Sequence, residues 1–290
     1  MQILLNGLIV GSAYALMGIG FSLLYSTVRY FNLAYGMLSV IAVYAVYSLM
    51  NEGLNFPVAI LLGGMLAIVL GVLSYIGLFR VMEKRKCSNL VILVASFGLL
   101  IVLQNLTALL WGNSTKSISL SDTILKGYEF FGLVITANQL MIAATAVVLM
   151  IVLELFLQKT KYGMAIRAIG DNQELTKVLG LQTEKVIVMV FVVTSFIGAL
   201  SASLIALEIG LRPTHGVLLV LKAVIAAIIG GLGSVRGALV GGLMLGVAEN
   251  FGIYFFGGVW QDTVAFVLLA VFLLFRPEGM FAKQKLVSIS

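Results

Sequence analysis

Long apolar runs separated by short polar intervals dominate the chain. Most runs approach the roughly 20 residues that an α-helix needs to cross the hydrocarbon core of a bilayer. Their apolar residues are continuous, whereas the strands of a membrane β-barrel alternate apolar and polar positions. The pattern therefore predicts eight or nine transmembrane helices. They lie near residues 3–25, 33–50, 57–79, 90–110, 138–157, 186–208, 216–231, 238–256 and 263–275.

Three of these runs are shorter than a full span, namely 33–50, 216–231 and 263–275. A short apolar segment at membrane depth is a tilted, broken or partly re-entrant helix. Such helices are tolerated where they are buried in protein or line a cavity. The uncertainty between eight and nine spans comes from these segments.

Composition supports the membrane assignment. Of the 290 residues, 61% are hydrophobic and 10% are charged, and the mean hydropathy is +1.13. An ordinary soluble domain does not have this composition. We therefore predict an all-α, polytopic transmembrane helical bundle in which residues 1–290 form one domain, lying in the lipid bilayer as a multi-pass protein.

Glycine is abundant, with 31 glycines against three prolines. Five of them form a seam that runs from a short loop into the following helix, with the first three at i, i+4 and i+8 and the last two on an adjoining line. Small residues at this spacing allow helices to pack closely. The loop 230–237 also offers positions where φ is positive, so that a helix can end there. The seam consists of Gly233, Gly237, Gly241, Gly242 and Gly246.

The 18 lysines and arginines outnumber the 12 acidic residues, which gives a net charge of +6. With nine spans, 14 of the 18 fall in intervals on one side of the membrane. The positive-inside rule makes this side cytoplasmic and places the loop 158–185 and the C-terminus there. The longest interval on the other side, 112–138, is predicted to be a polar loop. Because the basic residues lie in short loops between spans, they do not indicate nucleic-acid binding.

The interval 158–185 is the longest polar stretch that carries both signs of charge. Asp171 stands where an N-cap is expected, with Glu174 three residues later as the second half of a capping box. An apolar stripe follows, and Gly180 ends the turn. The prediction is a short surface helix, which needs a partner because it is marginal alone in water. The partner is either the membrane domain itself or a separate soluble protein. The stripe consists of Leu175, Val178 and Leu179.

Residues for catalysis or metal binding are scarce. The chain has one histidine, His215, and one cysteine, Cys87. The glycine-rich loop 230–234 lacks the GK[ST] ending of a P-loop, so the sequence has no usual site for ATP phosphates. We therefore expect a transport protein with no catalytic residues, no metal site and no cofactor of its own.

Two ionisable residues lie deep in predicted spans. Lys222 either contacts an anionic group of a substrate or snorkels to the nearby interface, and its place five or six residues from the end of the run favours snorkelling. Glu249 is either a proton or cation site or a hydrogen-bonded partner of a neighbouring helix, and the absence of a second carboxylate in its span favours the latter.

Small polar residues in the spans are candidates for a translocation pathway. Hydrogen bonding between helices explains each of them equally well. Together with Lys222, the candidates are Ser12, Asn32, Ser96, Gln104, Asn105 and Ser195.

Five motifs occur in order along nearly the whole chain. They are Asn6-Gly7 with Gly11-Ser12-Ala13-Tyr14-Ala15-Leu16; Arg29-Tyr30-Phe31-Asn32-Leu33-Ala34-Tyr35-Gly36; Thr160-Lys161-Tyr162-Gly163-Met164-Ala165-Ile166-Arg167-Ala168 with Asn172 and Leu179-Gly180; Leu221-Lys222-Ala223 with Gly230-Gly231-Leu232-Gly233-Ser234 and Gly237-Ala238; and Phe275-Arg276-Pro277-Glu278-Gly279-Met280-Phe281. In this order they resemble the permease subunits of bacterial ABC importers for branched-chain amino acids, the LivH type. The family usually has His at the place of Tyr35, Arg at that of Met164 and often Pro at that of Arg236.

The resemblance implies that 158–185 is a coupling loop that fits a cleft on a cytoplasmic ATPase subunit. Alternating access would follow from ATP binding and hydrolysis on that partner. The residues expected to couple to the ATPase are Gly163, Ala165, Arg167, Ala168, Asn172, Leu175, Val178, Leu179 and Gly180.

The resemblance also implies an assembly in the bacterial inner membrane. Its other members would be a second, related permease subunit, two ATPase subunits that bind ATP and Mg, and a periplasmic substrate-binding protein. The implied substrates are branched-chain, hydrophobic amino acids. Relatives that carry urea or short amides are one alternative, and an ATP-independent secondary transporter is another.

Overall fold

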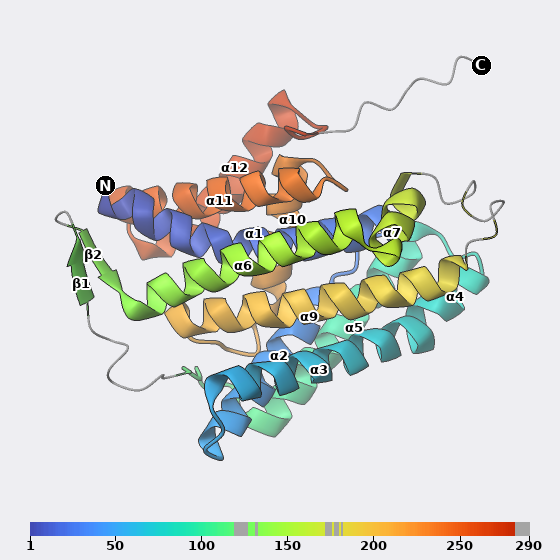
Figure 1. Ribbon diagram of the computed structural model, residues 1–290, viewed down its shortest axis with the longest axis horizontal. Coiled ribbons are helices and arrows are strands. Elements are labelled where there is room, and N and C mark those ends of the chain that lie inside the picture. The colour runs from blue at the N-terminus through green and yellow to red at the C-terminus, as the bar shows by residue number, and fades with distance from the viewer. Residues whose placement is uncertain (119–126, 131–132, 172–175, 177–179, 181, 282–290) are drawn as a thin grey trace.

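The computed structural model describes residues 1–118, 127–130, 133–171, 176, 180 and 182–281. Most of the long helices run along the long axis of the molecule (Figure 1). The N-terminus and a β-hairpin lie at one end, and α7 lies at the other. The elements are α1 (Gln2–Val28), α2 (Ala34–Asn51), α3 (Phe56–Ser74), η1 (Tyr75–Phe79), α4 (Arg80–Lys84), α5 (Asn89–Trp111), β1 (Gly127–Phe130), β2 (Leu133–Thr136), α6 (Ala137–Lys159), α7 (Lys161–Asp171), α9 (Thr183–Ile209), α10 (His215–Gly230), α11 (Val235–Phe256), η3 (Gly258–Trp260) and α12 (Gln261–Phe275).

The predicted helical bundle is confirmed. Within the described residues, eight helical stretches are long and apolar enough to cross a membrane, and the apolar α10 is shorter. Two features differ clearly from the sequence prediction. The helix expected to end at residue 79 continues through the π-helical turn η1 into α4, and the polar loop 112–138 contains the antiparallel pair β1–β2.

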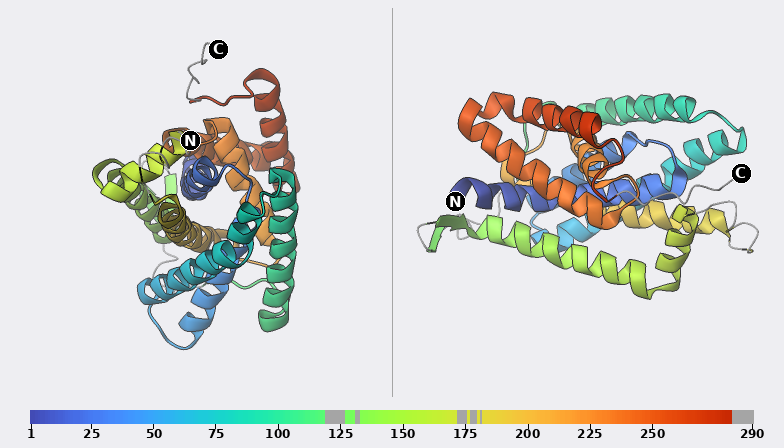
Figure 2. Two further views of the ribbon diagram at one scale, coloured as in Figure 1. Left: turned by 90° about the vertical axis from the view of Figure 1, so that its right-hand side faces the viewer. Right: turned by 90° about the horizontal axis from the view of Figure 1, so that it is seen from above.

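Helix α1 is the centre of the bundle. It packs against α6, α7, α9, α10 and α11, and in the end-on view of Figure 2 it lies between α6 on one side and α10 and α11 on the other. Most of its residues are buried on every face. A helix that is apolar all round is expected in such a position, because it has no face to offer to water.

Helices α1 and α11 approach each other closely along a line of glycines. A Cβ placed on Gly7 would lie 2.7 Å from Val247 Cα, and one on Gly246 would overlap Gly11 Cα. A side chain on Gly242 would likewise overlap the backbone of Ala15. The two helix backbones therefore touch where only glycine leaves room for them.

The other glycine line of α11 faces a different helix. A Cβ on Gly237 would overlap the Gly230 carbonyl of α10, and one on Gly241 would overlap the Ala226 carbonyl. Helix α11 is thus held between α1 and α10 by two adjoining lines of glycine. The connection before it has positive φ at Gly231 (103°) and Gly233 (88°), as predicted for this loop.

The C-terminal motif completes the end of α10. The last four carbonyls of a helix lack partners within the helix. Here Met280 N donates to Ile229 O at 2.9 Å, and Phe281 N donates to Gly230 O at 3.0 Å. Gly279 allows this return of the chain, because it adopts φ 81° and a Cβ there would overlap Gly231. The segment after α12 therefore caps α10.

Substitution of Gly246 by alanine tests the α1–α11 contact. Overpacking a tight contact costs about 1–3 kcal/mol, so G246A is expected to lower the melting temperature of the purified protein in detergent. The matched control is G98A on α5, where a Cβ meets open space. Replacement of glycine by alanine inside a helix is otherwise favourable by about 0.5–1 kcal/mol. Equal melting temperatures for the two variants would contradict the packing described for α1 and α11.

Candidate functional site

A buried ion pair joins three helices in the middle of the bundle. Lys222 of α10 places Nζ 3.0 Å from Glu249 Oε1 of α11. The same Nζ donates to Glu249 Oε2 at 3.1 Å and to the Tyr14 hydroxyl of α1 at 3.0 Å. Tyr14 in turn donates to Glu249 Oε2 at 3.1 Å. Lys222 is 7% exposed and Glu249 is completely buried, so all three groups depend on one another for polar partners.

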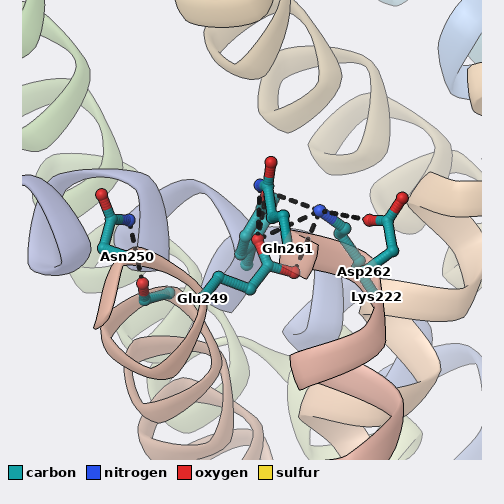
Figure 3. A network of polar contacts seen from close by, with 7 residues as sticks. Lys222, Glu249, Asn250, Gln261 and Asp262 are labelled. Carbon is teal, nitrogen blue, oxygen red and sulfur yellow. Dashed lines mark hydrogen bonds and ion pairs between the residues drawn. The ribbon is translucent and has the colours of Figure 1, made fainter. Parts of the chain in front are cut away.

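Helix α12 adds two side chains to this network, as Figure 3 shows. Asp262 Oδ1 lies 3.3 Å from Lys222 Nζ, and Gln261 Nε2 donates to Glu249 Oε2 at 2.8 Å. The Asp262 side chain is 45% exposed. The network therefore begins at a buried carboxylate and ends at one on the surface of the chain.

These contacts correct the prediction for Lys222. Snorkelling to the interface was favoured, but the side chain points into the bundle, because a carboxylate and a tyrosine hydroxyl from other helices are within reach there. Taking a charge out of water is costly unless it is paired and hydrogen-bonded. The prediction that Glu249 is a hydrogen-bonded partner of a neighbouring helix is confirmed.

A cavity of about 150 Å³ borders the network. It lies among α1, α6, α9 and α11, with Gln261 of α12 at its edge. Tyr14 and Gln261 line the cavity and also bond to Glu249. The network and the cavity are therefore parts of one region.

The polar residues of the cavity present oxygens. Asn250 Nδ2 donates to Gly246 O at 3.0 Å, and Gln261 Nε2 donates to Glu249 Oε2. Each amide nitrogen makes one of these bonds, and the two amide oxygens point away from them, as Figure 3 shows. Glu208 adds a carboxylate, which accepts from Gln139 Nε2 at 3.3 Å.

The other pathway candidates lie outside this network. Ser12, Asn105 and Ser96 donate to carbonyls of their own helices. Ser195 contacts Gly71 of α3, and Gln104 is half-buried. Asn32 is 1% exposed, and its side-chain amide makes no hydrogen bond to a described residue. Ser96 of α5 and Asn32, in the loop before α2, lie close together, because Ser96 accepts from Leu33 N at 3.1 Å.

The surface helix α7 occupies the opposite end of the molecule and was missed from sequence. Thr160 begins it, since its hydroxyl accepts from Gly163 N at 3.0 Å. Gly163, Ile166 and Ile169 form its buried face. Their spacing of three residues was the available signal, but the capping pattern at Asp171 and the apolar stripe after it favoured a helix further downstream.

Asp171 is the last residue of α7, so the first surface helix of the segment ends where one was expected to begin. The predicted helix that follows, with Asn172, Leu175, Val178 and Leu179, lies outside the described residues. Gly180 is exposed and has φ 78°.

The residues of α7 predicted to couple to an ATPase fall on two faces. Gly163 is buried, because a Cβ there would overlap the backbone of α6 at Phe156 and Leu157. Ala165 and Ala168 are half-buried, and Arg167 is exposed. Met164 lies on the same exposed side as Arg167, and 51% of it is accessible. Helix α7 thus has one face for its own bundle and one face open to a partner.

Comparison with known proteins identifies relatives over the whole chain. A family model described as "Branched-chain amino acid transport system / permease component" matches residues 3–275. The high-affinity branched-chain amino acid transport system permease protein BraD of Pseudomonas aeruginosa is 35% identical over 100% of this chain and 98% of its own. LivH of Escherichia coli, named as a permease protein of the same kind of system, is 29% identical over 100% of this chain and 97% of its own.

A solved structure has a similar fold. It is PsaBC from Streptococcus pneumoniae in complex with Fab, which aligns with a TM-score of 0.56 over 96% of this chain and 93% of that chain. The sequence identity is 15%, so the likeness concerns the fold alone.

The Lys222–Glu249 pair predicts strongly non-additive mutations. Removing one partner of a buried ion pair costs about 3–5 kcal/mol, because the other charge remains buried without its partner. K222M and E249Q are therefore each expected to lower the unfolding free energy in detergent, and the double variant should lose less than the sum. R212M, which removes an exposed cation, is the control and should have little effect. Strict additivity of the two single changes would show that the residues do not interact.

Proposed function

The chain belongs to the family of branched-chain amino acid transport permeases, and from this membership we propose that it is the membrane-spanning permease subunit of an ABC importer for branched-chain, hydrophobic amino acids. The single observation that carries the proposal is the family match over residues 3–275. BraD and LivH, which are similar over their full lengths, are both named as permease proteins of such systems. The comparisons do not favour urea, short amides or ATP-independent transport.

ATP is bound and hydrolysed on separate subunits in this proposal. The sequence has no P-loop ending in GK[ST], so its loops do not offer the usual cradle for phosphates. Two cytoplasmic ATPase subunits would hold ATP and Mg, and a second, related permease subunit would complete the pathway. A periplasmic binding protein would deliver the amino acid. Residues 1–290 act as one transmembrane domain in this assembly.

The segment 158–185 is the proposed contact with the ATPase, and α7 supplies its described part. The exposed side of α7 includes Arg167 and Met164. Its buried side packs against α1, α6 and α9. A force on the exposed side therefore reaches three helices of the bundle directly.

One contact ties α7 to α1. The guanidinium of Arg29, which follows α1, donates to the carbonyl of Gly170 near the end of α7. Gly170 also lies beside Ser26 of α1. Because α1 continues without a break to Tyr14, a displacement of α7 is carried as a rigid-body shift to the network around Lys222. This is the mechanical part of the proposed alternating access.

The α7 end of the molecule is proposed to face the cytoplasm of a bacterial inner membrane. Arg29, the basic group of residues 80–86, Lys161, Arg236 and Arg276 lie at the ends of helices that meet there. The β-hairpin end has Lys116 and Arg212 among its described residues. This asymmetry follows the positive-inside rule.

Charge reversal on α7 tests the proposed coupling. R167D should abolish ATP-dependent uptake of labelled leucine into vesicles that hold the assembled complex, and should reduce co-purification of the ATPase, because the substituted side chain lies on the open face of α7. The matched control is R85D, the same change on the exposed loop after α4 at the same end, which should leave both readouts near the wild-type level. Uptake by R167D at the wild-type rate, with the ATPase still co-purifying, would contradict the proposed coupling role of α7.

A further inference from the structure

We propose that the cavity beside the buried network binds the amino acid during its passage. The hydrophobic side chain would lie among isoleucines, and the α-ammonium group would lie at the oxygens of Glu208, Asn250 and Gln261. This inference rests on the proposed function and assigns a site and a substrate orientation to it.

The lining of the cavity suits a branched aliphatic side chain. Five isoleucines contribute to it, Ile9, Ile142, Ile205, Ile209 and Ile253, from α1, α6, α9 and α11. An apolar cavity of about 150 Å³ holds a molecule as large as benzene. The four-carbon side chain of leucine or isoleucine is smaller, so it fits the volume of about 150 Å³ found here.

The polar groups of the cavity suit an ammonium group. A primary ammonium has three N–H donors and no acceptor. The Asn250 and Gln261 amides present their oxygens, because their nitrogens donate to Gly246 O and Glu249 Oε2. Glu208 supplies a negative charge. Three acceptors, one of them charged, therefore match the three N–H donors of an amino acid's ammonium.

Binding in this cavity has a direct route to the transport machinery. Tyr14 lines the cavity, accepts a hydrogen bond from Lys222 and donates one to Glu249. Gln261 lines it and bonds to Glu249 from α12. A shift of α1 driven from α7 moves Tyr14, and this changes the wall of the cavity. The same side chains therefore connect the substrate to the proposed lever.

The ammonium contact is tested by Glu208→Gln. A hydrogen bond to a charged group contributes about 1.5–3 kcal/mol, which corresponds to a loss of about tenfold or more in the transport efficiency for leucine. Uptake is measured in vesicles holding the assembled complex with its binding protein and ATP. Glu52→Gln is the control, because Glu52 is an exposed carboxylate after α2 and lies outside the cavity. An unchanged efficiency for Glu208→Gln would overturn the ammonium site.

The side-chain contact is tested by enlarging the cavity. Ile142→Ala and, as a second variant, Val10→Ala remove methyl groups from the lining. Both should raise the uptake of phenylalanine relative to that of valine. The expected change in this ratio is about tenfold, which is the discrimination that a single methylene group gives in a hydrophobic pocket. A general loss of stability lowers both rates and leaves this ratio unchanged. A ratio equal to the wild-type value in both variants would overturn the site.

Uptake of leucine by the wild-type complex distinguishes failure of the proposed function from failure of the proposed cavity site. If the wild-type complex takes up no leucine, the proposed function fails and the cavity assignment fails with it. If the wild type transports leucine but either the Glu208→Gln effect or the change in the phenylalanine-to-valine uptake ratio is absent, the cavity assignment fails alone. A changed ratio with normal assembly of the complex supports the site.

Discussion

The packing of the bundle depends on one buried charge, that of Lys222, whose residue is only 7% exposed among apolar helices. Its charge must be matched by a carboxylate close by, because hydrocarbon and packed side chains cannot solvate it. Glu249 supplies that match, and both residues also need the Tyr14 hydroxyl. Helices α1, α10 and α11 therefore have to meet at one place, and α12 joins them through Gln261 and Asp262.

The glycine lines make this meeting possible. Helix α11 touches α1 through Gly242 and Gly246 and touches α10 through Gly237 and Gly241. Larger residues at these positions would separate the backbones and pull Glu249 away from Lys222. Close packing and charge pairing are thus two aspects of one constraint. The same packing places α1 in contact with both the surface helix α7 and the cavity.

Much of the fold was predictable, because most apolar runs are long enough to cross a bilayer and a helix satisfies its own backbone hydrogen bonds there. The positive φ of Gly231 and Gly233 followed from the tight glycine loop. The position of Lys222 did not, since its partners Tyr14 and Glu249 are remote in sequence and only the packing brings them together. Helix α7 was missed because Gly163, Ile166 and Ile169 gain their stability from contacts with the bundle. The β-hairpin was missed because its two strands are only four residues long each, and the run Leu133–Thr136, which is rich in β-branched residues, directly precedes an apolar helix.

The central claim is that this chain moves branched-chain amino acids with energy supplied by ATP on a partner. The most direct test measures the uptake of labelled leucine, urea and ribose into vesicles that hold the assembled complex. The binding protein is present in every assay, and each substrate is measured with and without ATP. The account predicts that leucine accumulates only when ATP is present, while urea and ribose stay at background. Accumulation of urea or ribose instead of leucine, or leucine uptake that does not need ATP, would contradict it.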